Sequence, residues 1–112
     1  MSPRMTVDHD HLEIVKAILE RLLPDREVWA FGSRVRGTPK RFADLDLAVI
    51  GEAPLPVSVS AALKEAFSDS DLPYRVDVVD WATTTEQFRE IIRAEHVVLH
   101  PTTSARTKRQ HA

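Results

Sequence analysis

The sequence predicts a small α/β fold, of the α+β kind, in which helices pack on one mixed β-sheet. Two segments, residues 10–23 and 57–67, carry apolar side chains at three- and four-residue spacings, the pattern of helices with one buried side. Three segments, residues 28–31, 44–50 and 74–81, are rich in β-branched and alternating apolar residues, as strands are. The resulting order of helix, strand, strand, helix, strand and helix favours one sheet covered by its helices.

Length and composition limit the kind of protein. A chain of 112 residues has the size of one compact domain, and 43% hydrophobic with 29% charged residues is ordinary for a soluble globular protein. The net charge of −2 argues against a protein that coats nucleic acid, so we expect no stable nucleic-acid binding. The absence of cysteine excludes disulfides and thiolate metal sites. No apolar run approaches the roughly 18 residues of a membrane span, so we expect a cytoplasmic protein.

The first half of the chain is predicted to form one helix and two strands. The helix ends before Pro24, which cannot continue it. A buried strand, residues 28–31, then leads into a Gly-Ser turn and a short basic segment. In the second strand, residues 44–50, period-two alternation sends Asp44 and Asp46 to one face. The opposite face, which we expect to be buried, consists of Leu45, Leu47 and Val49.

The second half continues with a loop, residues 51–56, the second helix and a turn over residues 68–73. The third strand is expected to send Asp77 to one face and the neighbouring valines to the other. A capping box of Thr84 and Gln87 predicts a third helix over residues 84–94. Its expected core stripe is Phe88, Ile91 and Ile92. A short final strand, residues 96–99, completes a domain of residues 1–100, and we expect the polar tail of residues 101–112 to be disordered.

Three carboxylates indicate metal-dependent phosphate chemistry. Asp44 and Asp46 stand roughly 6–7 Å apart along their strand, and Asp77 joins them if the second and third strands pair side by side. Carboxylate oxygens are hard ligands that hold Mg²⁺ together with waters and substrate phosphates. Two such ions clamp the attacking and leaving oxygens of a nucleotidyl transfer. Asp80 is an alternative third carboxylate, and the alternation along the strand favours Asp77.

The Gly-Ser turn is the candidate phosphate-binding element. Gly32 allows the backbone to approach a phosphate closely, and the Ser33 hydroxyl and nearby backbone N–H groups can donate to its oxygens. A triphosphate also needs positive charge to neutralise it. The candidates are the basic residues that follow: first Arg34 and Arg36, which flank the turn, and then Lys40 and Arg41.

At this point the sequence resembles a known family. Gly32-Ser33, ten further residues and then Asp44-Leu45-Asp46 are similar to the signature of the DNA polymerase β-like nucleotidyltransferase superfamily. The chain length, the GSRVRG segment and the VDVVD strand resemble its minimal branch, the MNT proteins, over about residues 12–99. The resemblance implies the polymerase β-like nucleotidyltransferase core.

The resemblance also implies roles for the candidate residues. Gly32 and Ser33 would hold the triphosphate of ATP, Asp44 and Asp46 would bind two Mg²⁺ ions, and Asp77 would be the third metal-binding carboxylate, acting on the acceptor hydroxyl. One departure is an alanine before Asp44 where the family commonly has serine, a position that is not a metal ligand. A larger departure is that we find no acceptor-binding domain after the catalytic core in this sequence, so we expect a partner to position the second substrate.

The function implied by the resemblance is that of an antitoxin. The chain would transfer AMP from ATP to a tyrosine of a helical HEPN ribonuclease toxin, within a hetero-oligomer, and so neutralise it. Two alternatives stay open: a catalytic subunit that nucleotidylates a small molecule held by a helical partner, and a catalytically silent antitoxin that acts by binding alone. The retained carboxylates weigh against the silent antitoxin, because a vestigial site has no need for mutually repelling charges.

Overall fold

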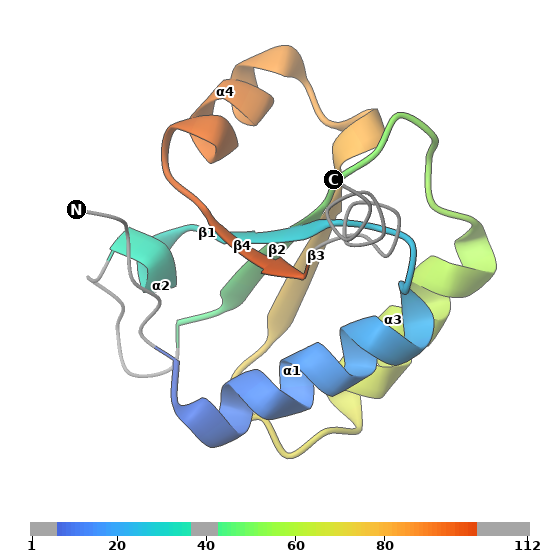
Figure 1. Cartoon of the computed structure of the whole chain (residues 1–112), viewed down its shortest axis with the longest axis vertical. Coiled ribbons are helices and arrows are strands. Elements are labelled where there is room, and N and C mark those ends of the chain that lie inside the picture. Colours follow the sequence, from blue (N-terminus) through green and yellow to red (C-terminus); the bar gives the residue numbers. More distant parts are fainter. Residues whose placement is uncertain (1–6, 37–42, 101–112) are drawn as a thin grey trace, which may run out of the picture.

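A four-stranded mixed sheet with strand order β3-β2-β1-β4 lies at the centre of the fold (Figure 1). Strand β1 is antiparallel to both β2 and β4, whereas β2 and β3 are parallel. The computed structural model describes residues 7–36 and 43–100. Within them the elements are α1 (His9–Leu22), β1 (Val28–Phe31), α2 (Ser33–Arg36), β2 (Leu45–Val49), α3 (Val57–Ser68), β3 (Val76–Asp80), a 3₁₀ turn (Trp81–Thr83), α4 (Glu86–Ala94) and β4 (Val97–His100). The predicted α/β class and the mixed sheet are confirmed.

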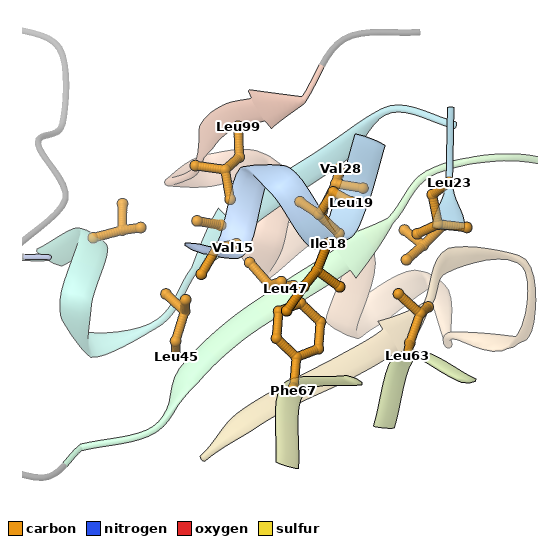
Figure 2. Close-up of a cluster of buried hydrophobic side chains, with 13 residues drawn as sticks. Val15, Ile18, Leu19, Leu23, Val28, Leu45, Leu47, Leu63, Phe67 and Leu99 are labelled. Atoms are coloured by element: carbon orange, nitrogen blue, oxygen red, sulfur yellow. The ribbon is translucent and has the colours of Figure 1, made fainter. Parts of the chain in front are cut away.

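Helices cover both faces of this sheet. Helices α1 and α3 pack on one face, where Figure 2 shows Val15 and Leu19 of α1, Leu63 and Phe67 of α3 and Leu47 of β2 within one apolar cluster. Helix α4 lies on the opposite face, where Ile92 packs against Phe31 and Ala48. Each large side chain that is fully buried in this way stabilises the fold by about 1.5–3 kcal/mol. The larger core therefore lies on the α1 and α3 side.

The predicted alternation along β2 is confirmed. Leu45, Leu47 and Val49 are fully buried in the core below α1 and α3. Ala48 belongs to the smaller cluster on the α4 side, so Asp46, two residues earlier, faces that side as well. The apolar residues of the strand thus anchor it in the core while its carboxylate is presented on the other face.

The segment after Gly32 differs from the prediction. A turn was expected there, and the chain instead forms the helical turn α2, in which the Val35 N–H donates to the Gly32 carbonyl at 3.0 Å. Gly32 adopts a φ of +84°, which reverses the chain direction between β1 and α2. The helical turn carries Val35 into the main core, where it is 2% exposed. The burial of Val35 accounts for the helical turn. A segment of four residues is too short to show a helical pattern in the sequence, so this burial could not be predicted.

The predicted capping box was wrong by one residue. The N-cap of α4 is Thr85, whose Oγ1 accepts a hydrogen bond from the Phe88 N–H at 3.2 Å. Thr84 instead donates its hydroxyl to the Asp80 carbonyl at 2.7 Å and closes the 3₁₀ turn. Consecutive threonines have the same capping chemistry, so the position of the 3₁₀ turn selects between them.

Several expectations fall outside the part of the chain that the structure describes. Lys40 and Arg41 lie between the two described ranges, and the tail lies after the second. The division into a domain of residues 1–100 and a tail of 101–112 therefore stays a prediction. Among the helices of the described ranges, none has both the length and the apolar character needed to cross a membrane.

Candidate active site

The sheet register brings two of the three predicted carboxylates together. Asp46 of β2 and Asp77 of β3 are directly paired positions of neighbouring parallel strands. Paired positions on one face of a sheet lie about 5 Å apart, so the two side chains share one site. The strand pairing on which the sequence argument depended is thus confirmed. Two negatively charged carboxylates this close repel each other unless a cation lies beside them.

These two carboxylates line a cavity of about 460 Å³ together with the Gly-Ser turn. Gly32 and Ser33 form its border at the end of β1, where the register sets Phe31 opposite Asp46. The remaining border is apolar and comes from β3 and α4. The complete lining is Phe31, Gly32, Ser33, Asp46, Asp77, Val78, Val79, Phe88 and Ile91. The cavity therefore has a polar side with donors and carboxylates, and an apolar side.

A larger hollow of about 830 Å³ lies between α3 and β3, and Asp77 lines this one too. Its other polar lining residues include Lys64, Arg75 and Asp80, but neither Gly32 nor Asp46. The smaller cavity is the better candidate for the chemistry, because it holds both carboxylates and the Gly-Ser turn. The larger hollow adjoins it through Asp77.

Gly32 is required at its position for a reason the sequence did not reveal. A Cβ atom on Gly32 would overlap Oδ2 of Asp46 and lie 3.2 Å from its Cγ. The turn and the carboxylate are therefore in direct contact, and only the missing side chain allows it. The prediction used Gly32 for close approach to a phosphate, and the structure adds that it makes room for Asp46.

Asp44 is not among the residues that line the cavity. It is half-buried and lies one residue before β2, where strand geometry does not yet hold its side chain to one face. Among the described residues, no group of three or more acidic or histidine side chains is close enough to hold a metal ion. The metal site formed by Asp44, Asp46 and Asp77 thus stays a prediction. Two of its three members, Asp46 and Asp77, lie in one cavity.

Arg34 is not among the residues that line this cavity. Its side chain is buried at 6% exposure, and its Nε donates to the Ala43 carbonyl at 2.9 Å. The guanidinium stacks over the Tyr74 ring at 3.9 Å, while burial raises the pKa of Tyr74 and the charge of Arg34 opposes that rise. Arg36 is the last residue of α2, and its side chain lies outside the described part. Arg34 thus ties α2 to the residue just before Asp44.

Replacing Arg34 with alanine is expected to lower the free energy of unfolding by about 2–3 kcal/mol. The change removes a charged hydrogen bond to Ala43 and the stacking on Tyr74 from a buried position. Arg34→Lys keeps the charge without the planar donor group and should recover only part of that stability. Urea unfolding of the three proteins measures this. Equal stability of Arg34→Ala and the unchanged chain would contradict the structural role.

Three residues near the site were missed or given another role by the sequence argument. Phe88 and Ile91 of α4 line the cavity and are 36% and 60% exposed, although both were expected in the core. Only Ile92 of the predicted stripe is buried. Arg75 has Nη2 at 4.0 Å from Oδ1 of Asp77, a pair with both side chains largely exposed. The sequence contained a signal for this contact, because Arg75 lies two residues before Asp77 and residues at that spacing share a strand face.

Asp80, the alternative third carboxylate, has backbone partners. Its Oδ2 accepts from the Leu55 N–H at 2.8 Å, and its Oδ1 accepts from the Ala82 N–H at 3.3 Å. It caps the 3₁₀ turn and fixes the loop before α3. These backbone contacts give Asp80 a role in the fold, whereas Asp77 forms the exposed pair with Arg75.

Comparison with known proteins agrees with this geometry. A nucleotidyltransferase domain family matches residues 12–100. A protein of Haemophilus influenzae named probable protein adenylyltransferase MntA is 57% identical over 96 residues, which are 86% of this chain and 84% of that protein. The family match spans the Gly-Ser turn and all three predicted carboxylates.

Solved structures resemble the fold at low identity. A chain of a toxin–antitoxin complex with AMP-PNP superposes with a TM-score of 0.69 at 23% identity, over 84% of this chain and 76% of that chain. A complex of tri-AMPylated Shewanella oneidensis HEPN toxin with MNT antitoxin matches with a TM-score of 0.58 at 20% identity, over 85% and 72% of the chains. The fold, the paired carboxylates beside a Gly-Ser turn and the match over nearly the whole sequence assign this chain to the nucleotidyltransferase domain family.

Proposed function

We propose that this chain is a protein adenylyltransferase that acts as an antitoxin, transferring AMP from ATP to a tyrosine hydroxyl of a HEPN-type toxin. The observation that carries the proposal is that Gly32, Ser33, Asp46 and Asp77 line one cavity. The name of the Haemophilus influenzae relative supports protein adenylylation. The similar fold of chains in complexes with AMP-PNP and with an AMPylated HEPN toxin supports the donor and the kind of partner.

The partner and the compartment follow from the same proposal. The acceptor hydroxyl belongs to a second protein, so the chain works in a hetero-oligomer with a helical HEPN protein. ATP is an intracellular metabolite, which makes the cytoplasm the compartment of the reaction. No observation favours a small-molecule acceptor over a protein acceptor.

Mg²⁺ is the proposed cofactor, and the donor set fits it. This ion usually binds through one or two carboxylates and completes its octahedron with waters and substrate phosphates. Asp46 and Asp77 supply hard oxygen donors from paired strand positions, so a cluster of three protein ligands is not needed before the nucleotide binds. We propose Asp44 as a further ligand and two ions in total. When bound, Mg²⁺ neutralises the phosphates and the charge that develops on them.

In the proposed mechanism the chain positions two substrates for in-line attack. Gly32 and the Ser33 hydroxyl bind the triphosphate, and the glycine allows its oxygens to approach the backbone closely. The acceptor oxygen forms a bond to the α-phosphorus while the bond from that phosphorus to pyrophosphate breaks. The Asp77 carboxylate takes the proton of the acceptor hydroxyl. Each step thus uses a group that lines the cavity.

The test is the intact mass of the protein that co-purifies with this chain, measured before and after addition of ATP and Mg²⁺. We expect the partner to gain one or more AMP-sized increments, and to gain none with Asp46→Asn. A tight partner whose mass never changes with any nucleoside triphosphate would contradict the transfer. It would favour an antitoxin that acts by binding alone.

The choice between the two aspartates of β3 gives a second prediction. Asp77→Asn is expected to reduce transfer by a hundredfold or more, about the size of a lost general base, without lowering stability. Asp80→Asn is expected to lower the free energy of unfolding by about 1–2 kcal/mol, because the single oxygen of the amide can accept from only one of the Leu55 and Ala82 N–H groups. Folded Asp80→Asn should transfer AMP at nearly the unchanged rate. Normal transfer by Asp77→Asn together with lost transfer by Asp80→Asn would make Asp80 the third carboxylate.

A further inference from the structure

The apolar side of the cavity has no role in the mechanism described so far. It includes Phe88 and Ile91, which are 36% and 60% exposed on α4. A single exposed isoleucine on a protein surface needs no explanation. Ile91 differs because it borders the same cavity as Asp46 and Asp77. We call the pair Phe88 and Ile91 the α4 wall.

The α4 wall is held in position by the residues beneath it. The rings of Phe88 and Phe31 meet edge to face, with centroids 5.7 Å apart and planes at 80°. Phe31 is 7% exposed, and Ile92, next to Ile91, is fully buried. The wall is therefore a fixed apolar surface, formed by a helix that packs on the sheet through the neighbouring residue.

The two arginines of α4 are engaged elsewhere. Arg89 donates through Nε and Nη2 to the Trp81 carbonyl at 3.0 and 2.7 Å, and Arg93 donates to Glu86 at 3.0 Å. None of the described residues that line the cavity is a cation. Phosphate groups need positive charge or N–H donors, so the α4 wall is unsuited to the triphosphate. Its chemistry matches an apolar group.

The reaction geometry assigns that apolar group to the acceptor. In-line displacement requires the attacking oxygen and the leaving pyrophosphate on opposite sides of the α-phosphorus. The Gly-Ser turn is occupied by the triphosphate in the proposed function, so the acceptor approaches from another side of the cavity. The hollow of about 830 Å³ between α3 and β3 is lined by neither Phe88 nor Ile91, so a nucleoside that extends toward it leaves the α4 wall uncovered.

We infer that the α4 wall is the docking surface for the aromatic ring of the acceptor tyrosine on the partner protein. The ring packs on Phe88 and Ile91, and its hydroxyl points to Asp77. A phenol combines a flat apolar ring with one hydroxyl, as the cavity combines an apolar wall with a carboxylate. A serine or threonine would leave most of the wall uncovered. This inference rests on the proposed function and adds the residues that select the acceptor.

The test compares Ile91→Ala with the unchanged chain, using the HEPN-type protein that co-purifies with it. Because Ile91 is 60% exposed, its truncation should not unfold the protein. We expect kcat/KM for AMP transfer to the partner to fall about tenfold, mainly through KM, since the change removes apolar surface that the acceptor buries. The affinity for ATP, measured by titration calorimetry with Mg²⁺ present, should stay within twofold. Ile91→Leu should restore transfer.

The matched control is Val98→Ala, which truncates a 50% exposed residue of β4 that does not line the cavity. It should change neither transfer nor ATP affinity. A fall in ATP affinity with Ile91→Ala would place the nucleoside on the wall and overturn the inference, as would equal transfer by both variants. Peptide mass spectrometry should locate AMP on tyrosine, and AMP on serine or threonine would also overturn it. If the chain without substitutions never modifies the partner, the proposed function itself is refuted.

Discussion

Asp46→Asn is expected to lower AMP transfer by about a thousandfold or more while the fold stays intact. Asp46 is paired in register with Asp77 and lines the cavity beside the Gly-Ser turn. Asparagine has almost the same shape but lacks the charge that stabilises a bound cation, and interactions of this kind dominate phosphoryl transfer. Single-turnover transfer with excess ATP and Mg²⁺ measures the loss.

Stability provides the control within the same variant. Like charges at directly opposed strand positions destabilise a sheet by up to about 1 kcal/mol, so removing one should leave urea unfolding unchanged or slightly improved. Asp71→Asn is the matched surface variant, because Asp71 is exposed in the loop between α3 and β3 and lines neither cavity. It should transfer AMP normally. Transfer by Asp46→Asn at a rate near that of Asp71→Asn would refute the assignment of Asp46.

Asp44→Asn tests whether Asp44 belongs to the proposed metal site. Asp44 precedes β2 by one residue and does not line the cavity. If the residue turns toward Asp46 when the nucleotide and metal bind, its neutralisation should reduce transfer as strongly as Asp46→Asn. A variant with normal transfer would remove Asp44 from the proposed set.

The strand faces of Asp46 and Asp77 could be predicted because they rest on a period of two, whereas the pairing of the two strands entered the prediction only as a condition. Leu45, Leu47 and Val49 must be buried, which fixes the opposite face of β2 without any knowledge of the rest of the fold. The same reasoning on β3 sends Asp77 to that face. Alternation holds only inside the ladder, and Asp44 lies one residue before it, so the predicted face of Asp44 stays a prediction.

The helical segments were harder to predict in detail, because their outcome depends on what packs against them. The stripe of α4 indicated which side is apolar, but not that the sheet covers Ile92 and leaves Ile91 60% exposed. The basic residues after Gly32 were candidates for phosphate contact because of their charge. The helical turn α2 buries Arg34 against the ring of Tyr74, a contact between residues 40 positions apart that no local pattern contains.

Gly32→Ala is expected to damage stability and transfer together. Alanine at a φ of +84° costs about 1–3 kcal/mol from backbone strain alone. Its Cβ atom would also overlap Oδ2 of Asp46, so either the turn or the carboxylate has to move. Urea unfolding should show the loss of stability. The protein that remains folded should transfer AMP at least about a hundredfold more slowly, since small misplacements of reacting groups have effects of this size.

Gly51→Ala separates the two effects. Gly51 also has a positive φ, 154°, but the added Cβ would meet the flexible end of the Arg26 side chain, and neither Gly51 nor Arg26 lines the cavity. This variant should lose some stability and keep the transfer rate of its folded fraction. If Gly32→Ala behaved in the same way, the contact between the turn and Asp46 would have no part in catalysis. Because that contact joins the turn proposed to bind phosphate to the strand of the proposed metal ligand Asp46, we expect transfer to fall much further in Gly32→Ala than its loss of stability explains.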